Sequence, residues 1–261
     1  YKAPIQRWNE GDNIWGVLGP IWRGVNDTKD LNPRTYLMAF RRGCYIATQF
    51  KPGVAKVIYE MINPGRVLDT SCGWGDRLAG FYTSSAKEYI GCDPNPNTYA
   101  QYMNQVYEYE KLLGNRTPIV KEERDYFTIN ASKKVTIHRC GAEDLPWDEI
   151  EDIDCAFTSP PYFNWEQYGE EDGQSFNQFN SNEEWNNGFL RKTIQNAYKG
   201  LKKDKYLALN VANIKSHKTF EDDTVRIAVE EGFTHTDTYK LQLSSQESGA
   251  KYEPVFIFQK K

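Results

Sequence analysis

The stretch VLDTSCGWGDR, residues 67–77, decides how the rest of the chain can be interpreted. It opens as a short apolar strand that ends at Asp69, and it continues as a loop with glycines at Gly73 and Gly75 before a helical pattern begins. Such glycines let the backbone approach a ligand at the carboxyl end of a parallel sheet. A second apolar strand ends at Asp93, where an acid can accept hydrogen bonds from ribose hydroxyls.

The same loop indicates which kind of nucleotide is bound. A dinucleotide fingerprint requires a third glycine, and position 78 is Leu78. Asp69 would also repel a phosphate, whereas it suits a cationic ligand with an ammonium group, such as the methionine part of S-adenosylmethionine. Glu143, after the third expected strand, is placed to contact the adenine end, although an acid at the start of a helix is favoured by the helix dipole as well.

Strand and helix patterns alternate along the chain, which predicts a doubly wound, mostly parallel α/β sheet. The last two strands have no helix between them and are expected to form an antiparallel hairpin at the sheet edge. We expect seven strands, at 66–69, 88–93, 135–139, 153–158, 206–211, 234–243 and 255–259. Helices are expected at 53–63, 77–85, 97–113, 183–201 and 219–231. The chain is interpreted as a single domain, with an N-terminal arm (1–50), a core (51–261) and loop insertions at 114–131 and 163–182.

A second motif, Ser159-Pro160-Pro161-Tyr162, follows the fourth expected strand. Adjacent prolines stop the strand ladder and carry no N–H, so this turn offers mainly hydrogen-bond acceptors and an aromatic ring. Acceptors at Ser159 and Pro160 suit an exocyclic amino group, which donates two hydrogens, and Tyr162 can stack on a base. A base reaches such a pocket only when it is single-stranded or flipped out of a duplex.

Together the two motifs resemble motifs I and IV of the amino-methyltransferases that modify cytosine N4 or adenine N6 of DNA. The stretches 73–77 and 93–95 are similar to a subgroup of phage and bacterial DNA methylases with a TSPPY motif, and Gln49-Phe50-Lys51-Pro52 is similar to motif X, which flanks the methionine moiety. The resemblance implies a Rossmann-like class I methyltransferase fold and S-adenosylmethionine as cofactor. The catalytic residues it implies are Ser159, Pro160, Pro161 and Tyr162. The cofactor-binding residues are Phe50, Lys51, Asp69, Thr70, Ser71, Gly73, Trp74, Gly75, Asp93, Pro94, Asn95, Ala142 and Glu143.

The expected reaction is methylation of a DNA base, with cytosine N4 favoured over adenine N6 because Ser replaces the Asp that is commoner in adenine enzymes. Enzymes with this motif order usually carry a large recognition domain after the catalytic motif, and here only about 100 residues follow Tyr162. Methylation of an RNA base or of a protein side-chain amide therefore stays open, as does a non-catalytic binding module. Methylation at carbon 5 of cytosine is set aside because it needs a Pro-Cys loop, which the chain lacks.

Composition and charge indicate which metals, membranes and partners to expect. Five dispersed cysteines and three dispersed histidines give no metal-ligand spacing, so we expect no metal. No apolar run approaches the roughly 20 residues that cross a bilayer, and no signal peptide is visible, so a cytoplasmic protein without a membrane partner is expected. The net charge is −4, yet 13 acids and no Lys or Arg lie between Cys140 and Leu190, which leaves the remainder net basic. A basic face for nucleic acid and scattered solvated lysines both fit this distribution.

Overall fold

The computed structural model describes residues 32, 49–114, 118–163, 178–246 and 249–261. Its contacts divide the chain into two units, Tyr1–Gln49 and Phe50–Lys261, and nearly all described residues belong to the second. The expected N-terminal arm and most of the expected loop insertion at 163–182 lie outside the described residues.

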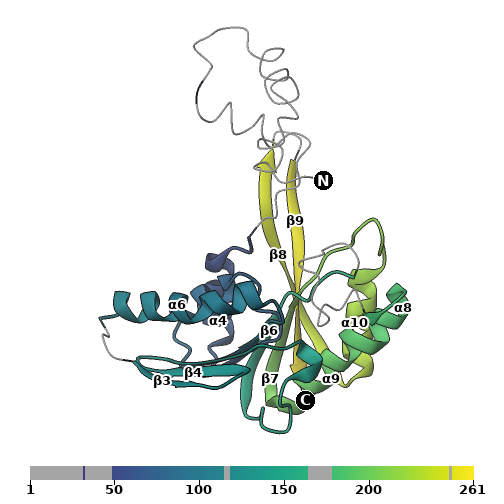
Figure 1. Ribbon diagram of the computed structural model, residues 1–261. Helices are drawn as coiled ribbons and strands as arrows, with labels where there is room; N and C mark the ends of the chain where they lie inside the picture. Colours follow the sequence, from purple (N-terminus) through teal and green to yellow (C-terminus); the bar gives the residue numbers. More distant parts are fainter. Residues whose placement is uncertain (1–31, 33–48, 115–117, 164–177, 247–248) are drawn as a thin grey trace, which may run out of the picture. The chain divides into compact units, whose positions relative to one another are not determined.

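The second unit is built on one nine-stranded sheet with the order β3-β4-β5-β2-β1-β6-β7-β9-β8 (Figure 1). Strands β5, β2, β1, β6 and β7 run parallel, and β9 inserts antiparallel between β7 and β8. The parallel strands are β1 (Arg66–Asp69), β2 (Glu88–Cys92), β5 (Lys134–His138), β6 (Ile153–Thr158) and β7 (Leu201–Asn210). The antiparallel strands are β3 (Ile119–Glu122), β4 (Tyr126–Asn130), β8 (Phe233–Gln246) and β9 (Gly249–Lys260).

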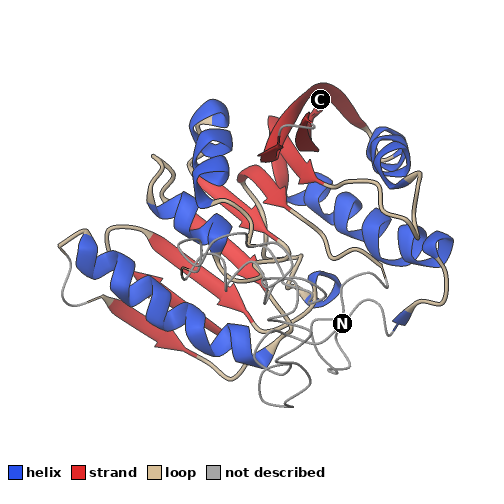
Figure 2. Ribbon diagram, turned by 90° about the horizontal axis from the view of Figure 1, so that it is seen from above, coloured by secondary structure: helices blue, strands red, loops and turns tan. Residues whose placement is uncertain are grey.

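Helices cover both faces of this sheet, as the view from above shows (Figure 2). One face carries α4 (Pro52–Ile62), α5 (Asp76–Tyr82) and α6 (Pro96–Leu112), and the other carries α8 (Asn182–Trp185), α9 (Arg191–Gly200) and α10 (Phe220–Glu230). Each face has its own apolar cluster, and successive residues of β6 alternate between them: Cys155 and Phe157 face one cluster, and Ala156 faces the other. Because β6 is covered on both sides, all six of its residues are buried.

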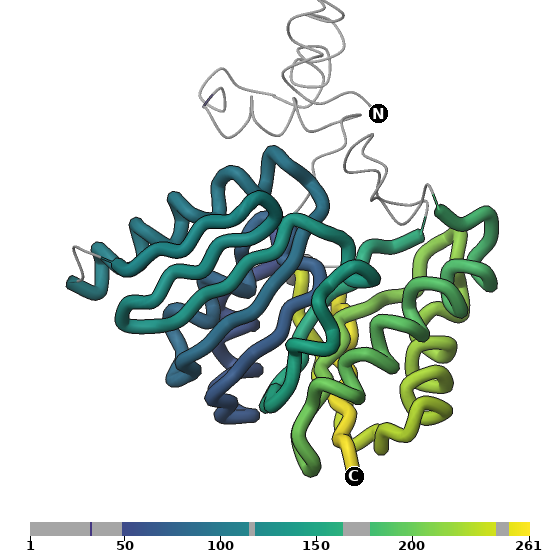
Figure 3. Tube along the Cα trace, turned by 60° about the horizontal axis from the view of Figure 1, so that its bottom comes forward, coloured from purple at the N-terminus to yellow at the C-terminus, as the bar shows by residue number. Residues whose placement is uncertain are grey.

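The prediction of a loop at 114–131 was wrong, because this segment contains the β3–β4 hairpin, which pairs with β5 and enlarges the sheet from seven strands to nine (Figure 3). All four residues of β3 are exposed, so its sequence has no alternation that marks a strand. In β4 the alternation is present, since Phe127 and Ile129 are buried beneath α6. The sequence pattern therefore indicates one strand of the hairpin, β4, but not the other, β3.

Two further elements differ in extent from the prediction. The expected helix at 183–201 is interrupted by a π-helical turn, Asn186–Leu190, where Gly188 lies against Phe179 so closely that an added Cβ would come within 2.1 Å of its ring. The terminal hairpin is longer than expected. Its pairing with β7 stops at Asn210↔Val255, but β8 and β9 remain paired as far as Gln246↔Gly249, beyond the carboxyl end of β7.

Candidate functional site

Four loops that the sequence singled out follow neighbouring parallel strands, and the structure brings them to the same edge of the sheet. Strand β1 lies between β2 and β6, and β5 lies beside β2. The glycine loop leaves β1, Asp93 follows β2, Ala142 and Glu143 follow β5, and the Ser-Pro-Pro-Tyr loop follows β6. The carboxyl edge of an open parallel sheet is where such folds bind ligands.

The two glycines of the first loop have backbone conformations that require glycine. Gly73 has φ 57° and Gly75 has φ 82°, both in the left-handed region. A Cβ on Gly75 would also lie 2.1 Å from Oε1 of Gln105. Gly75 precedes the first turn of α5, so the same residue turns the chain and lets α6 approach closely.

Side chains from α6 and β2 hold this loop in place. The hydroxyl of Tyr102 donates to the carbonyl of Gly73, and Gln105 Nε2 donates to the carbonyl of Trp74 at 3.0 Å. On the other side, the amide of Gly73 donates to Oδ2 of Asp93 at 2.9 Å. The loop is thus preformed before any ligand binds, which lowers the entropic cost of binding. Trp74 itself is 44% exposed.

Asp69 is fully buried and occupied by contacts within the protein. Its Oδ2 accepts hydrogen bonds from Arg77 Nε at 2.8 Å and from the Tyr89 hydroxyl at 2.6 Å, and its Oδ1 accepts from the Ser71 amide at 3.1 Å. Burial lowers the pKa of Arg77, but the Asp69 carboxylate more than offsets this effect, and the pKa lies above its usual value. We expected Asp69 to face a cationic ligand. Instead it has no exposed surface and forms an ion pair inside the fold.

Asp93 is an acceptor at the end of β2, as the sequence indicated. Its Oδ1 accepts the amide of Asn95 at 2.9 Å, and Oδ2 accepts that of Gly73. Burial raises its pKa to about 6 despite these bonds. Asn95 caps α6 by accepting from the amides of Asn97 and Thr98, and Pro94 lies between the two site residues.

Glu143 has a buried oxygen that lacks a partner among the described residues. Its Oε1 accepts from Gln178 Nε2 at 3.1 Å, while Oε2 is enclosed with no donor. The preceding Ala142 is buried, and its carbonyl accepts from Trp147 Nε1 at 2.8 Å. An enclosed carboxylate oxygen without a donor is costly, so a ligand N–H at this position would stabilise it.

The Ser-Pro-Pro-Tyr loop is fixed to the end of β7 by two hydrogen bonds. The Ser159 hydroxyl donates to the carbonyl of Asn210 at 3.1 Å, and the Tyr162 hydroxyl accepts from the amide of Ala212 at 3.0 Å. The Tyr162 ring packs edge-on against Phe220, with centroids 5.3 Å apart. Pro160 is buried and Pro161 half-buried.

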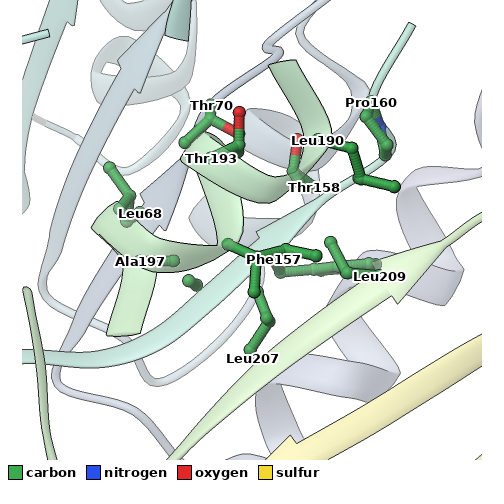
Figure 4. A pocket seen from close by; sticks show the side chains of 12 residues that line it. Leu68, Thr70, Phe157, Thr158, Pro160, Leu190, Thr193, Ala197, Leu207 and Leu209 are labelled. Atoms are coloured by element: carbon green, nitrogen blue, oxygen red, sulfur yellow. The ribbon is translucent and has the colours of Figure 1, made fainter. Parts of the chain in front are cut away.

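Beneath this loop lies a small cavity between β1, β6 and α9 (Figure 4). Its volume is about 10 Å³, and Thr70, Thr158, Pro160 and Leu190 are among its lining residues. A cavity needs roughly 10–15 Å³ to hold one water molecule. It is therefore too small for a cofactor or a base and belongs to the packing under the site.

Phe50 and Lys51 are neighbours in the sequence but contact different parts of the structure. The Arg77 guanidinium lies 5.5 Å from the Phe50 ring centroid, and the same ring packs edge-on against Phe157 at 5.9 Å. Lys51 Nζ donates to the carbonyls of Gln242 at 2.6 Å and Leu243 at 3.2 Å, where the terminal hairpin extends past β7. Phe50 thus contacts the residues that support the glycine loop, whereas Lys51 is committed to the hairpin.

Sequence reasoning missed Arg77, Tyr89, Tyr102 and Gln105, which hold the glycine loop. Arg77 lies two residues after Gly75, so its position was a usable signal. The other three lie on β2 and α6, and nothing local in the sequence connects them to the loop.

The described ranges contain no group of three or more His, Cys, Asp or Glu that could hold a metal ion. His217 is buried and bonded to Asp223 at 2.9 Å, and the four described cysteines are unpaired. Among these residues, no helix has the length and apolar character needed to cross a bilayer.

Comparison with solved structures identifies the fold. The chain is similar to Trm1 from Pyrococcus horikoshii in complex with S-adenosyl-L-methionine (TM-score 0.54, 13% identity, 82% of this chain and 56% of that one). It is also similar to a SAM-dependent O-methyltransferase from Thermotoga maritima (0.50, 12%, 82% and 67%). A third similar structure is precorrin-6y C5,15-methyltransferase from Geobacter metallireducens GS-15 (0.50, 11%, 85% and 96%). No protein-family model and no curated protein sequence matches the chain.

The chain therefore has the Rossmann-like fold of SAM-dependent methyltransferases, which confirms the predicted fold class. It spans only 56% of the length of the Trm1 chain. At these identities the likeness concerns the fold, and the names of the similar proteins differ in the atom that receives the methyl group.

Proposed function

We propose that this protein is an S-adenosylmethionine-dependent methyltransferase that acts on an exocyclic amino nitrogen of a DNA base, cytosine N4 in preference to adenine N6. The proposal has three parts, namely the cofactor, the amino nitrogen and the base. Each rests on different residues of the carboxyl edge.

The cofactor part is supported by two acceptors at that edge. The buried Oε2 of Glu143 lacks a donor among the described residues, which suits the exocyclic amine of adenine. Asp93 accepts hydrogen bonds from the amides of Gly73 and Asn95, and the remaining lone pairs of its two oxygens can accept hydrogens from ribose hydroxyls. The preformed glycine loop lies on the other side of Asp93 from Glu143, and its Trp74 is exposed, so these three features together suit an adenosine.

The amino-nitrogen part rests on one observation, the hydrogen bond from Ser159 to Asn210. A serine hydroxyl has a single hydrogen, and here it is used, so the oxygen can only accept from a substrate. Pro160 and Pro161 have no N–H to offer. The loop therefore presents hydrogen-bond acceptors to its substrate, which favours a substrate group that donates hydrogen bonds. An amino group donates them, whereas a ring carbon or a deprotonated oxygen does not.

Bound S-adenosylmethionine would supply an activated methyl group. The residues of the chain then have a positioning task. Ser159 Oγ and the Pro160 carbonyl would accept the two hydrogens of the amine, and Tyr162, held at Ala212 and Phe220, would contact the base with its ring. Near-attack positioning of this kind can be worth roughly 7–11 kcal/mol. None of these residues needs to form a covalent bond to the substrate.

The proposal that the substrate is a DNA base rests on the family resemblance. A comparison of methylation of different classes of substrate tests it. Tritiated S-adenosylmethionine is incubated with single-stranded DNA, duplex DNA, RNA and protein, and labelled nucleosides are separated. We expect label in DNA, highest in the single-stranded form because a base must leave the stack. Label in protein alone or in RNA alone would contradict the base assignment. Calorimetry that shows no binding of S-adenosylmethionine would contradict the enzyme itself.

A further inference from the structure

The ion pair between Asp69 and Arg77 has a consequence for how the cofactor is held. An acid at the end of the first strand, next to a Gly-x-Gly loop, was expected to attract the ammonium group of the ligand. In this structure both charges are buried, with Asp69 fully enclosed and Arg77 at 5% exposure, and they lie 2.8 Å apart. The carboxylate charge is thus neutralised before any ligand arrives.

Arg77 also contacts two further segments of the candidate site. A second nitrogen of its guanidinium, Nη2, donates to the carbonyl of Ser71, at the start of the glycine loop. The flat face of the same group lies over Phe50, which precedes α4. One side chain therefore joins the end of β1, the loop and Phe50, which are 8, 6 and 27 positions away from it in the sequence.

Asp69 reaches the loop from the other direction. Its Oδ1 accepts the Ser71 amide while Oδ2 is held by Arg77 and Tyr89, so the carboxylate cannot rotate without losing one of these bonds. Both peptide groups of Ser71, its N–H and its C=O, are thereby fixed by the ion pair.

We propose that Asp69 and Arg77 are positioning residues that set the shape of the glycine loop, and that Asp69 does not bind the ammonium group of the cofactor. This inference rests on the proposed function, because it concerns how that cofactor is held. It predicts that damage to the pair weakens all ligands that use the loop by the same factor, whether or not they carry an amino-acid part.

Two ligands separate this role from direct binding. S-adenosylmethionine has the ammonium group, and 5′-methylthioadenosine has the same adenosine and a thioether but lacks the amino-acid part. Calorimetric affinities of both are compared for the wild type and for Asp69→Asn, which keeps the shape of the side chain and removes its charge. We expect both affinities to fall together, with their ratio unchanged within about threefold. If Asn weakens only S-adenosylmethionine, by tenfold or more, the carboxylate binds the ammonium group and the proposal is wrong.

A second variant covers the case in which Asp69→Asn does not fold. Arg77→Lys keeps the buried cation but cannot hold Asp69, Ser71 and Phe50 at once, and it leaves the Asp69 carboxylate in place. The proposal predicts an equal loss of affinity for both ligands here as well, and an unchanged affinity for either ligand would contradict it. A wild type that binds neither ligand would refute the proposed function instead, so the two failures are distinguishable.

A measurement without any ligand adds an independent readout. Amide hydrogen exchange is followed at Ser71 and Gly73 in the wild type, in Asp69→Asn and in Asp222→Asn. The last variant is the control, because Asp222 is an exposed residue in the first turn of α10. Faster exchange at both loop amides in Asp69→Asn but not in the control is expected. Exchange at the wild-type rate in Asp69→Asn would show that the pair does not hold the loop.

Discussion

The amide of Gly73 donates a hydrogen bond of 2.9 Å to the carboxylate of Asp93, and this bond joins the glycine loop after β1 to the end of β2. The two residues are 20 positions apart, and each was singled out in the sequence for a different part of one ligand. Their contact means that the glycine loop and Asp93 form one structural unit. The ionisation of Asp93 should therefore change the affinity for the proposed cofactor.

Binding of S-adenosylmethionine should weaken as the pH falls below about 6, the value to which burial raises the pKa of Asp93. Ribose hydroxyls donate to the carboxylate form, so binding requires the charged state and should lose up to about tenfold in affinity per pH unit below that value. Calorimetry at pH 5 to 8 measures this. Asp93→Asn should bind weakly with a flat profile, and a wild-type affinity independent of pH would argue against contact with Asp93.

The same group should affect stability with the opposite sign. Because the pKa of Asp93 is raised from 3.8 in the ligand-free fold, its stabilising contribution is fully present below pH 3.8 and is lost as the pH rises through about 6. The wild type should therefore lose melting temperature relative to Asp93→Asn between pH 4 and pH 7. Parallel melting curves of the two proteins over this range would contradict the raised pKa.

Removing one charge of the buried pair should be far more harmful than removing both. Arg77→Met leaves Asp69 charged and buried without its cation, which should cost about 3–5 kcal/mol in the free energy of unfolding. Asp69→Asn combined with Arg77→Met should recover a substantial part of this loss, because no unpaired charge remains. Urea unfolding of both single variants and of the double variant gives the coupling energy. Additive losses would show that the two residues do not act as a pair.

Close packing of α4 on α5 is tested at Gly80. An added Cβ there would lie 2.5 Å from the Cβ of Ala55 and 2.8 Å from the carbonyl of Pro52, which is too close for either to remain in place. Gly80→Ala should therefore lower the free energy of unfolding by about 1–3 kcal/mol. Gly53→Ala is the matched control, since nothing lies within 4 Å of its added Cβ. It should be neutral or stabilising, and a similar loss in both variants would show that the contact is not responsible.

The Tyr162 ring should matter to the reaction more than its hydroxyl. Tyr162→Ala removes the surface that contacts the base and should cost roughly 1–3 kcal/mol in transition-state stabilisation. Tyr162→Phe keeps the ring and its packing on Phe220 but loses the bond to the Ala212 amide, so the loss should be smaller. The kcat/KM of both variants on a single-stranded oligonucleotide decides this. Equal losses would assign the role to the hydroxyl rather than to the ring.

Local sequence patterns predicted the parts of this fold that local chemistry determines. The apolar run of β1, the glycines at positive φ and the strand of six buried residues before Ser159 each have a pattern within a few positions. Parallel strands have their carboxyl ends at one edge of the sheet, and the four candidate loops lie there. The two prolines after β6 likewise predicted a turn that offers acceptors.

What the sequence could not predict depends on contacts between distant positions. Strand β3 has no buried face, so its assignment depends on pairing with β4, which no local pattern shows. The contacts of Asp69 could not be predicted for the same reason. An acid at a strand end has the same local pattern whether it faces a ligand or a buried arginine, and only the fold brings Arg77 and Tyr89 to it.

The position of the transferred methyl group on the product shows whether the Ser159 loop receives an amino nitrogen. A single-stranded oligonucleotide is incubated with S-adenosylmethionine carrying a deuterated methyl group, and the product nucleosides are identified by mass spectrometry and nuclear magnetic resonance. We expect the labelled methyl on the exocyclic nitrogen of cytosine, and strongly reduced labelling with Ser159→Ala. A labelled methyl on a carbon or an oxygen of any base would contradict it, as would full activity of Ser159→Ala.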